Sequence, residues 1–359
     1  MTESATFTVD MISYPLYQLY SLQGDLVGYQ DLRRVLLQAL KGYDQATFTK
    51  KIVKASLSKS IHKGKFLGFK VGGVHLQTLN FNDGSLQGRE ISLVIEHEDV
   101  ALRDLRLIVG QKRDLLLRMT IPDAAKFRLA QDLAWSSDAI EGTTIEKDES
   151  RSLLIAGAPD PVGEDKIELS NHFHAIQTLV FPMASKRLQD IDENYMKALH
   201  RAIDIVRMTD PNKGEYRTTN VTIRDRPNPE FADHVDVPRL CVEMFRQLHT
   251  MGDQDPVYVA SWFHFQFVQI HPFVDGNGRV GRMLMNTVLI QKDFPLACIQ
   301  PGVRDIYFYS LVASRRNERQ YQLTGKLPEG HDTPYDLLIR ILTESLLRSL
   351  DIGLYYGSH

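Results

Sequence analysis

The 359-residue chain has little of several features that mark particular classes of protein. It has only two cysteines, Cys241 and Cys298, and both lie among apolar residues, which favours reduced core residues over a disulfide. No apolar run approaches the roughly 18 residues that a membrane span needs, and the N-terminal residues do not resemble a secretion signal. The sequence therefore predicts no membrane partner and a cytoplasmic location.

An excess of charge of one sign is also absent. The 42 lysines and arginines are balanced by 45 acidic residues, which gives a formal net charge of -3. Proteins that bind nucleic acid through its phosphates usually carry a basic excess, so we expect no nucleic-acid partner. The lysine-rich segment 50–65 could bind an anionic partner, but the helical spacing of its apolar residues favours a solvated helix face.

The residue pattern divides the chain into three regions. Residues 1–100 mix helical spacing, as at 28–42, with strand-like stretches at 65–81 and 89–98. From about residue 100 the pattern is helical almost throughout, with a Pro- and Gly-rich loop at 155–165. We therefore expect a mainly α fold: a mixed α/β N-terminal region of unknown role (1–100), a helical region (101–165) and a helical core (166–359).

The segment IHPFVDGNGRVGR (270–282) concentrates charge and glycine between two apolar stretches. Apolar residues recur at helical spacing on both sides of it, at Val259, Phe263, Phe267 and Ile270 and again at Val280, Leu284, Val288 and Leu289. This pattern predicts two helices joined by a glycine loop, whose amides point toward the second helix and favour an anion. Arg279 and Arg282 lie in the first turn of that helix, where cations oppose the helix dipole. A phosphate group would resolve this conflict.

The remaining polar residues of the segment suggest a reaction. Asp275 lies beside the predicted anion site, where a divalent cation could bridge it to phosphate oxygens. His271 has an ordinary pKa of about 6.5 and could accept a hydroxyl proton. Together these groups are typical of a phosphoryl or nucleotidyl transfer site. The competing interpretation, a glycine-rich turn with incidental charges, is disfavoured because all of these residues occur together at fixed spacing.

This segment resembles the signature of the Fic (Fido) family, HPFx[D/E]GNGRxxR, at every defined position, and a weaker resemblance extends from about residue 125 to 345. The resemblance implies an all-helical core and the transfer of AMP from ATP to a protein hydroxyl. It also implies roles for particular residues: His271 as the base, Asp275 as the Mg²⁺ ligand, Gly276, Asn277 and Gly278 as the phosphate nest, and Arg279 and Arg282 as ligands of the outer phosphates. Relatives that transfer phosphate alter the basic residues, so the intact pair favours AMP transfer.

A second stretch, KGEYRTTNVTIRD (213–225), alternates β-favouring residues within a helical region and predicts a short exposed β-hairpin. It resembles the flap of the family, which pairs its main chain with a protein target and presents a Tyr, Thr or Ser hydroxyl to the site. The resemblance implies that Val221, Thr222, Ile223 and Arg224 lie near the nucleotide. A plain surface hairpin is the alternative.

A third stretch, DIYFYSLVASRRNE (305–318), resembles the helix that closes the adenine pocket in the family. The resemblance implies that Tyr307 and Phe308 contact the nucleotide. Many relatives carry an asparagine near position 315, where this chain has Arg315 and Arg316. The sequence therefore does not predict which nucleotide base is preferred.

The stretch WSSDAIEGTTI (135–145) ends a predicted helix at Gly142, a residue type typical of helix C-caps. Glu141 would then face the negative end of the helix dipole, which predicts a compensating cation elsewhere. Ser137, Glu141 and Gly142 resemble the inhibitory pattern [S/T]xxxE[G/N] of the family, whose glutamate pairs with the second arginine of the motif, here Arg282. An ordinary surface glutamate is the alternative.

The leading hypothesis is a self-inhibited protein adenylyltransferase that uses Mg-ATP, with another protein or itself as target, and that could form a homo-oligomer. A second hypothesis reverses the reaction, with Glu141 positioning water to remove AMP from a modified protein. A third is an inactive nucleotide-binding interaction module. A DNA-binding regulator would need a helix-turn-helix, and we find no convincing one after the helical core.

Overall fold

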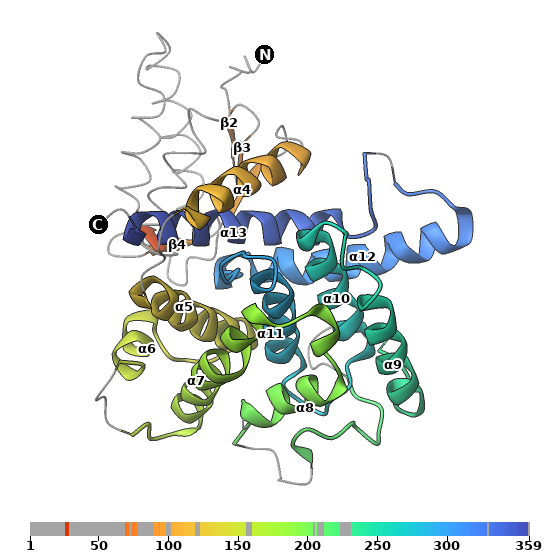
Figure 1. The fold of residues 1–359 in the computed structure, drawn as a ribbon, viewed down its shortest axis with the longest axis horizontal. Coiled ribbons are helices and arrows are strands. Elements are labelled where there is room, and N and C mark those ends of the chain that lie inside the picture. Colours follow the sequence, from red (N-terminus) through yellow and green to blue (C-terminus); the bar gives the residue numbers. More distant parts are fainter. Residues whose placement is uncertain are drawn as a thin grey trace.

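The computed structural model describes residues 26–28, 69–71, 74–77, 90–92, 94–97, 102–118, 123–155, 160–203, 205–206, 212–222, 231–328 and 330–357. From residue 102 onward these residues are mainly helical (Figure 1). The helices are α4 (Leu102–Leu117), α5 (Asp123–Glu141), α6 (Lys147–Leu153), α7 (Glu164–Ala175), α8 (Glu193–Ala202), α9 (Val237–Leu248), α10 (Pro256–Ile270), α11 (Asn277–Ile290), α12 (Arg304–Thr324) and α13 (Asp336–Gly357).

Short strands occur before residue 100. Four of them lie in the stretches where the sequence predicts strands, and the fifth, β1, lies at the start of the predicted helix. Strands β2 (Phe69–Val71), β3 (Val74–Gln77) and β5 (Val94–His97) form one antiparallel sheet in the order β2-β3-β5, and β1 (Leu26–Gly28) pairs with β4 (Glu90–Ser92). Apart from Gly28, the predicted helix at 28–42 lies outside the described residues, as does the lysine-rich segment 50–65. The prediction of a mainly α fold is confirmed. The mixed α/β character of residues 1–100 stays a prediction, because its predicted helix lies outside the described residues.

Helices α10 and α11 form the centre of the helical bundle (Figure 1). Helix α10 is mostly apolar and has no exposed residue, because α9, α11 and α13 all pack against it. It begins at Asp255, whose carboxylate accepts a hydrogen bond of 2.8 Å from the amide of Tyr258, with Pro256 in the first turn. Helix α11 is buried along almost its whole length against α5, α8 and α10. The predicted pair of helices around residues 271–276 is thereby confirmed.

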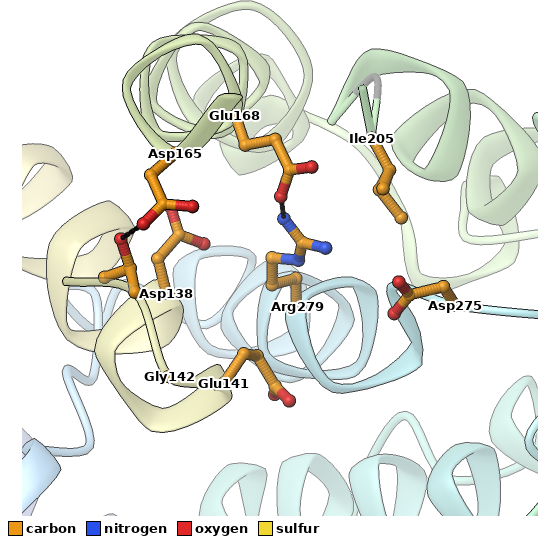
Figure 2. Close-up of a pocket in the computed structure, with 9 residues that line it drawn as sticks. Asp138, Glu141, Gly142, Asp165, Glu168, Ile205, Asp275 and Arg279 are labelled. Carbon is orange, nitrogen blue, oxygen red and sulfur yellow. Dashed lines mark hydrogen bonds and ion pairs between the residues drawn. The ribbon is translucent and has the colours of Figure 1, made fainter. Parts of the chain in front are cut away.

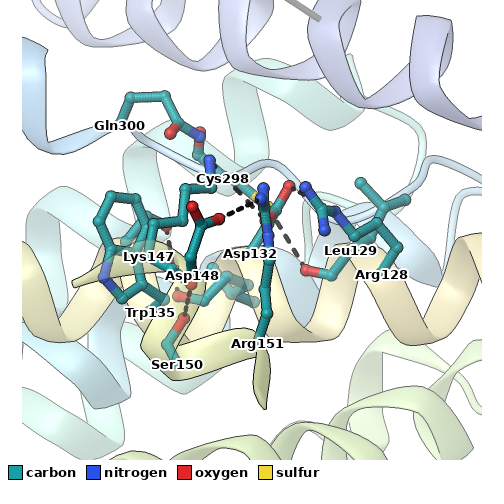
Figure 3. Close-up of polar contacts among 12 residues, drawn as sticks. Arg128, Leu129, Asp132, Trp135, Lys147, Asp148, Ser150, Arg151, Cys298 and Gln300 are labelled. Atoms are coloured by element: carbon teal, nitrogen blue, oxygen red, sulfur yellow. Dashed lines mark hydrogen bonds and ion pairs between the residues drawn. The ribbon is translucent and has the colours of Figure 1, made fainter. Parts of the chain in front are cut away.

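Helix α5 is anchored by a buried charge cluster (Figure 3). Asp132 of α5 is almost fully buried and lies within 3.8 Å of cationic nitrogens from three elements. These nitrogens belong to Arg128 of α5, Lys147 and Arg151 of α6, and Arg348 of α13. Because removing one partner of a buried charge cluster is costly, this contact fixes α5 against α6 and α13. The same helix carries Ser137 and Glu141 in its C-terminal part.

Two predicted absences can be compared with the described residues. Cys241 and Cys298 are buried and form no disulfide, as the sequence predicts for core cysteines, and burial raises the pKa of the Cys241 thiol to about 12. Within the described part of the chain, no helix combines the length and apolar character needed to cross a bilayer.

Candidate active site

The loop between α10 and α11 folds tightly around two left-handed residues. His271 has φ 54° and ψ 59°, and Gly276 has φ 77°. Asn277 closes the loop with both ends of its side-chain amide: its oxygen accepts from the amide of Phe273 at 2.9 Å, and its nitrogen donates to the carbonyl of Phe273 at 2.8 Å. The asparagine of the motif therefore shapes the loop, and the glycine before it supplies a backbone conformation that other residues rarely adopt.

The His271 imidazole is oriented as a base. Its Nδ1 lies 3.3 Å from the carbonyl oxygen of Val268, and because a carbonyl can only accept, Nδ1 carries the proton and Nε2 the lone pair. Burial lowers the pKa of His271 to about 4; the Val268 carbonyl opposes this shift and the Arg217 charge adds to it. The imidazole is thus neutral at neutral pH and able to accept a proton.

The amides at the N-terminus of α11 are held in place by a residue that the sequence does not single out. The carbonyl of Asp275 accepts from Nε2 of His200 at 3.1 Å, and Nδ1 of His200 accepts from the amide of Gly214 at 2.7 Å. The His200 ring also stacks on Phe273, with centroids 3.8 Å apart. Burial lowers the pKa of His200 to about 4, which keeps the ring neutral and both hydrogen bonds intact. His200 therefore links α8, the motif loop and residue 214.

Arg282 of α11 is held by the end of α5. Its side chain is 1% exposed; Nε donates to the Ser137 hydroxyl at 2.8 Å, and Nη2 donates to the Ser137 carbonyl at 2.9 Å and to Glu141 Oε1 at 2.6 Å. Burial alone would raise the pKa of Glu141, but Arg282 and Arg279 outweigh it and hold the pKa below its ordinary value. Glu141 is therefore ionised at neutral pH, and the expected ion pair with Arg282 is present.

The end of α5 places Glu141 by its backbone geometry. Gly142 has φ 107°, its amide donates to the Ala139 carbonyl at 3.2 Å, and the next amide, of Thr143, donates to the Asp138 carbonyl at 3.1 Å. These two bonds form a Schellman motif, the glycine C-cap that the sequence predicts. The chain therefore turns away immediately after Glu141, whose carboxylate stays beside α11.

The other motif arginine also has a carboxylate partner, which the sequence analysis missed. Arg279 Nη1 donates to Glu168 Oε2 of α7 at 2.7 Å, and both side chains are largely buried. The second oxygen of Glu168 accepts from the amide of Val206 at 3.1 Å. Both arginines that would bind phosphate are thus paired with carboxylates from other helices, Arg279 with α7 and Arg282 with α5.

A polar cavity of about 200 Å³ opens beside these pairs (Figure 2). Its lining residues are Asp138, Glu141, Gly142, Thr143, Asp165, Glu168, Ile205, Asp275 and Arg279. His271, at the opposite end of the loop from Asp275, does not line it. The structure therefore brings one candidate of each kind to this cavity: Glu141 of the inhibitory pattern, Arg279 for phosphate and Asp275 for the metal. Among the described residues, no three His, Cys, Asp or Glu side chains gather so that they alone could hold a metal ion.

The predicted hairpin at 213–225 is wrong over its described part. Residues 213–222 form turns and bends with no strand, and residues 223–225, including Ile223 and Arg224, lie outside the described residues. The reason is that the segment bonds to the motif loop instead of to itself: the amide of Arg217 donates to the carbonyl of Pro272 at 2.9 Å. Val221 and Thr222 lie in this stretch, outside any helix or strand.

The two aromatic candidates on α12 have different environments. Tyr307 is 1% exposed, its hydroxyl lies 2.7 Å from Nε2 of His264, and its ring packs 5.9 Å from the guanidinium carbon of Arg282. Phe308 is partly exposed and packs against the Arg304 guanidinium. Tyr307 therefore packs against the Arg282 guanidinium inside the protein. Of the two rings, only that of Phe308 is partly exposed to solvent.

Comparisons with known proteins agree on one family. The sequence model of the Fic/DOC family matches residues 190–289. The chain is 26% identical over 268 residues to a protein adenylyltransferase Fic of Drosophila grimshawi, covering 72% of this chain and 50% of the relative. It is 29% identical over 220 residues to a protein adenylyltransferase fic-1 of Caenorhabditis elegans, covering 59% and 42%. The chain thus spans about half the length of these relatives or less.

A solved structure shows the same fold. The crystal structure of a Fic-domain-containing signalling protein from Bacteroides thetaiotaomicron superposes with a TM-score of 0.57 at 21% identity, covering 72% of this chain and 98% of that chain. At 21% identity, this similarity shows a shared fold and nothing more.

Proposed function

We propose, on the premise that residues 190–289 form a Fic/DOC-family domain, that the protein transfers AMP from ATP to a hydroxyl side chain of a protein and that Glu141 restrains the transfer. The observation that supports this most is the N-terminus of α11, where two buried arginines follow the glycine nest. Each arginine is paired with a carboxylate that a phosphate could replace.

The transfer would use His271 and the end of α11. Nε2 of His271 takes the proton from the target hydroxyl as that oxygen attacks the α-phosphorus of ATP. The bond from the α-phosphorus to the bridging oxygen breaks, and pyrophosphate leaves. The Gly276 amide binds Asp275, and the amides of Asn277 and Gly278 are left to hold the phosphates. Together with the guanidinium groups of Arg279 and Arg282, they stabilise the charge that moves onto the leaving group.

Asp275 is suited to hold Mg²⁺ together with the nucleotide. Its Oδ1 accepts from the Gly276 amide at 2.6 Å, which orients the carboxylate, and its side chain lines the cavity. Mg²⁺ is commonly bound by one or two carboxylates plus substrate phosphates, so a single aspartate fits this ion without a cage of protein ligands. The ion would neutralise charge on the phosphates.

The target and the nucleotide base would lie on either side of the motif loop. We propose that the segment 213–225 docks the target and that Val221, Thr222, Ile223 and Arg224 border the nucleotide. Residues 218–222 belong to no strand, which supports main-chain pairing with a target segment. The partly exposed Phe308 is the better placed of the two aromatic residues to contact the base, while Tyr307 acts through Arg282.

The proposed brake acts by competition for Arg282. The guanidinium cannot bind Glu141 at 2.6 Å and the γ-phosphate in good geometry at the same time. ATP bound beside the glutamate would hold its triphosphate askew, and a misplacement of about 1 Å at the reacting atoms costs about 100-fold in rate. Removing the Glu141 carboxylate frees Arg282 for the γ-phosphate.

The experiment that tests the function compares two labels. The full chain carrying Glu141→Gly is incubated with a cell lysate and either α-labelled or γ-labelled ATP. Relative to lysate without the protein, we expect added protein labelling from the α-label alone. That added labelling should be about 10²- to 10⁴-fold weaker once His271→Ala is added, since that is the usual cost of losing a general base. ATP binding should survive His271→Ala, because the imidazole holds no phosphate. Labelling from the γ-position would indicate that the protein transfers phosphate and not AMP. ATP binding without any labelling would indicate an inactive nucleotide-binding module.

A second function, removal of AMP from a modified protein, is supported by the state of Glu141. Its carboxylate is ionised, lines the cavity and is 39% exposed, so it could orient a water molecule. Release of AMP from a labelled target by wild-type protein, lost in Glu141→Gly, would favour this function over transfer.

A further inference from the structure

Arg217 is a buried guanidinium at the base of the motif loop, outside the family signature. It is 3% exposed. Its Nε donates to the carbonyl of His271 at 2.8 Å and its Nη2 to that of Ile270 at 3.4 Å, while its own amide donates to the carbonyl of Pro272 at 2.9 Å. One side chain and its amide therefore bind three consecutive carbonyls, those of the residue before the base, of the base itself and of the residue after it.

The same guanidinium also binds the segment that covers the base. Nη1 donates to the Thr219 carbonyl at 2.9 Å and to the Asn220 side chain at 3.2 Å, and Nη2 donates to the Ala232 carbonyl. The amide of Ala232 in turn donates to the carbonyl of Gln269 at 3.3 Å. Residues 231 and 232 are thereby fixed to the end of α10.

Phe231 lies directly on the His271 ring. The two rings are stacked with centroids 3.8 Å apart and an interplanar angle of 19°. The other restraint on the imidazole is the contact from Nδ1 to the Val268 carbonyl, and at 3.3 Å this is a weak hydrogen bond. The backbone of His271 is also left-handed, a conformation that a residue with a side chain keeps only when its surroundings impose it. The stack and the carbonyl contacts provide that restraint.

We propose that Arg217 and Phe231 form a clamp that positions the base: Arg217 fixes the backbone of His271, and Phe231 fixes the plane of its ring. The buried Arg217 side chain and the Phe231 ring both contact His271, and we assign them as positioning residues that act through it. The inference rests on the proposed function, because it assigns the clamp to the proton transfer in that reaction. The positive charge of Arg217 also helps to keep the pKa of His271 low.

The clamp differs from a plain apolar cover in what it requires. If Phe231 only covers His271, its volume is what counts, and leucine at position 231 should support transfer as well as phenylalanine does. If Phe231 stacks on the imidazole, a flat ring is needed, so tyrosine should support transfer and leucine should not. Arg217→Lys is the matching change at the other residue, since it keeps the charge and loses the fork of donors. Phe127→Leu is the control, because the Phe127 ring of α5 packs edge-on against Phe173 of α7.

The test uses the full chain in the Glu141→Gly background, with transfer rate and ATP affinity measured separately. We expect Phe231→Leu and Arg217→Lys to lower kcat about 100-fold with ATP affinity unchanged, as misplacement of a reacting group does. Phe231→Tyr and Phe127→Leu should stay within a few-fold of the parent. Equal kcat for Phe231→Leu and Phe231→Tyr would overturn the clamp. If Arg217→Lys fails to fold, the Phe231 variants still decide.

Nitrogen NMR of the imidazole provides a readout that does not depend on transfer. The His271 signals are assigned by their loss in His271→Ala. We expect the tautomer with the proton on Nδ1 in the parent and in Phe231→Tyr, and a mixture of tautomers in Phe231→Leu and Arg217→Lys. A parent that transfers no AMP but shows these changes would refute the proposed function and leave the clamp standing. If the parent transfers AMP and the variants change neither kcat nor the tautomer of His271, the clamp is refuted and the proposed function stands.

Discussion

A methyl group at position 278 should dislodge Glu141 from Arg282. A Cβ added to Gly278 would lie 2.0 Å from Oε1 and 3.0 Å from Cδ of Glu141, and 3.2 Å from Nη1 of Arg282. Because 2.0 Å is far below van der Waals contact and the carboxylate ends a flexible side chain, Glu141 is the group that moves. The backbone of Gly278 is helical, so alanine itself introduces no strain there.

The expected magnitude follows from what Arg282 loses. Removing one partner of a fully buried ion pair costs about 3–5 kcal/mol, but the Glu141 side chain is 39% exposed, so solvent screening reduces the loss to about 1–3 kcal/mol. Alanine regains up to about 1 kcal/mol over glycine in a helix. Gly278→Ala should therefore destabilise the wild-type chain by about 1–2 kcal/mol and stabilise the Glu141→Gly chain, where no carboxylate stands in the way, by up to about 1 kcal/mol.

The measurement is a double-mutant cycle by urea unfolding of the wild type, both single variants and the double variant. A coupling of about 2 kcal/mol is expected, well above the roughly 0.5 kcal/mol seen for independent sites. Gly110→Ala in α4 is the control: a Cβ there meets no atom within 4 Å, so its effect should be the same in both backgrounds. Additive effects of Gly278→Ala and Glu141→Gly would show that Glu141 does not rest on Arg282 in solution.

Three further predictions concern the metal, the second arginine and pH. Asp275→Ala should lower Mg²⁺-dependent transfer by about 100-fold or more, since a catalytic metal ion contributes several kcal/mol, and full activity with a chelator present would rule out its assigned role. Glu168→Gln should raise ATP affinity, measured by calorimetry, about tenfold, because it frees Arg279 for a charge-assisted hydrogen bond worth about 1.5–3 kcal/mol. The control is Asp165→Asn, which removes a carboxylate that binds the hydroxyls of Thr143 and Thr144 and should leave ATP affinity unchanged. Equal effects of the two variants would refute the assignment. Burial lowers the pKa of three histidines to about 4, namely His200, His264 and His271. Since the unfolded chain takes up these protons near pH 6.5, the stability to urea should be complete above that pH and fall as the pH drops from about 6.5 to 4, and a flat profile over this window would contradict it.

The sequence predicts the parts of the site that are local in the chain. Apolar spacing predicts α10, α11 and the loop between them, and a glycine after a helical run predicts the end of α5, which the structure has as a Schellman motif at Gly142. The pairing of Ser137 and Glu141 with Arg282 follows from the resemblance to the family, not from spacing, because about 140 residues separate the partners.

The sequence does not predict the partners that tertiary packing supplies. Glu168 is 111 residues from Arg279, and nothing in its surroundings distinguishes it from a solvent-facing glutamate of an amphipathic helix. Arg217 and Phe231 lie 54 and 40 residues before the base with no periodic signal. The hairpin prediction failed over residues 213–222 for the same reason. Alternating β-favouring residues predict an extended chain, but the amide of Arg217 bonds to the motif loop and its guanidinium to the Thr219 carbonyl, and no strand forms within these described residues.

Self-labelling with α-labelled ATP tests the central claim, that the chain transfers AMP and that Glu141 restrains it through Arg282. Wild type, Glu141→Gly, Arg282→Ala and the double variant are compared at equal concentration. Labelling of Glu141→Gly should exceed wild type by about 100-fold or more, in line with the cost of a misplaced triphosphate. Arg282→Ala should show no such rise, and the double variant should match Arg282→Ala, because the phosphate anchor is lost with the partner of the brake. Unchanged or lower labelling in Glu141→Gly would contradict the account, as would a double variant that labels as strongly as Glu141→Gly.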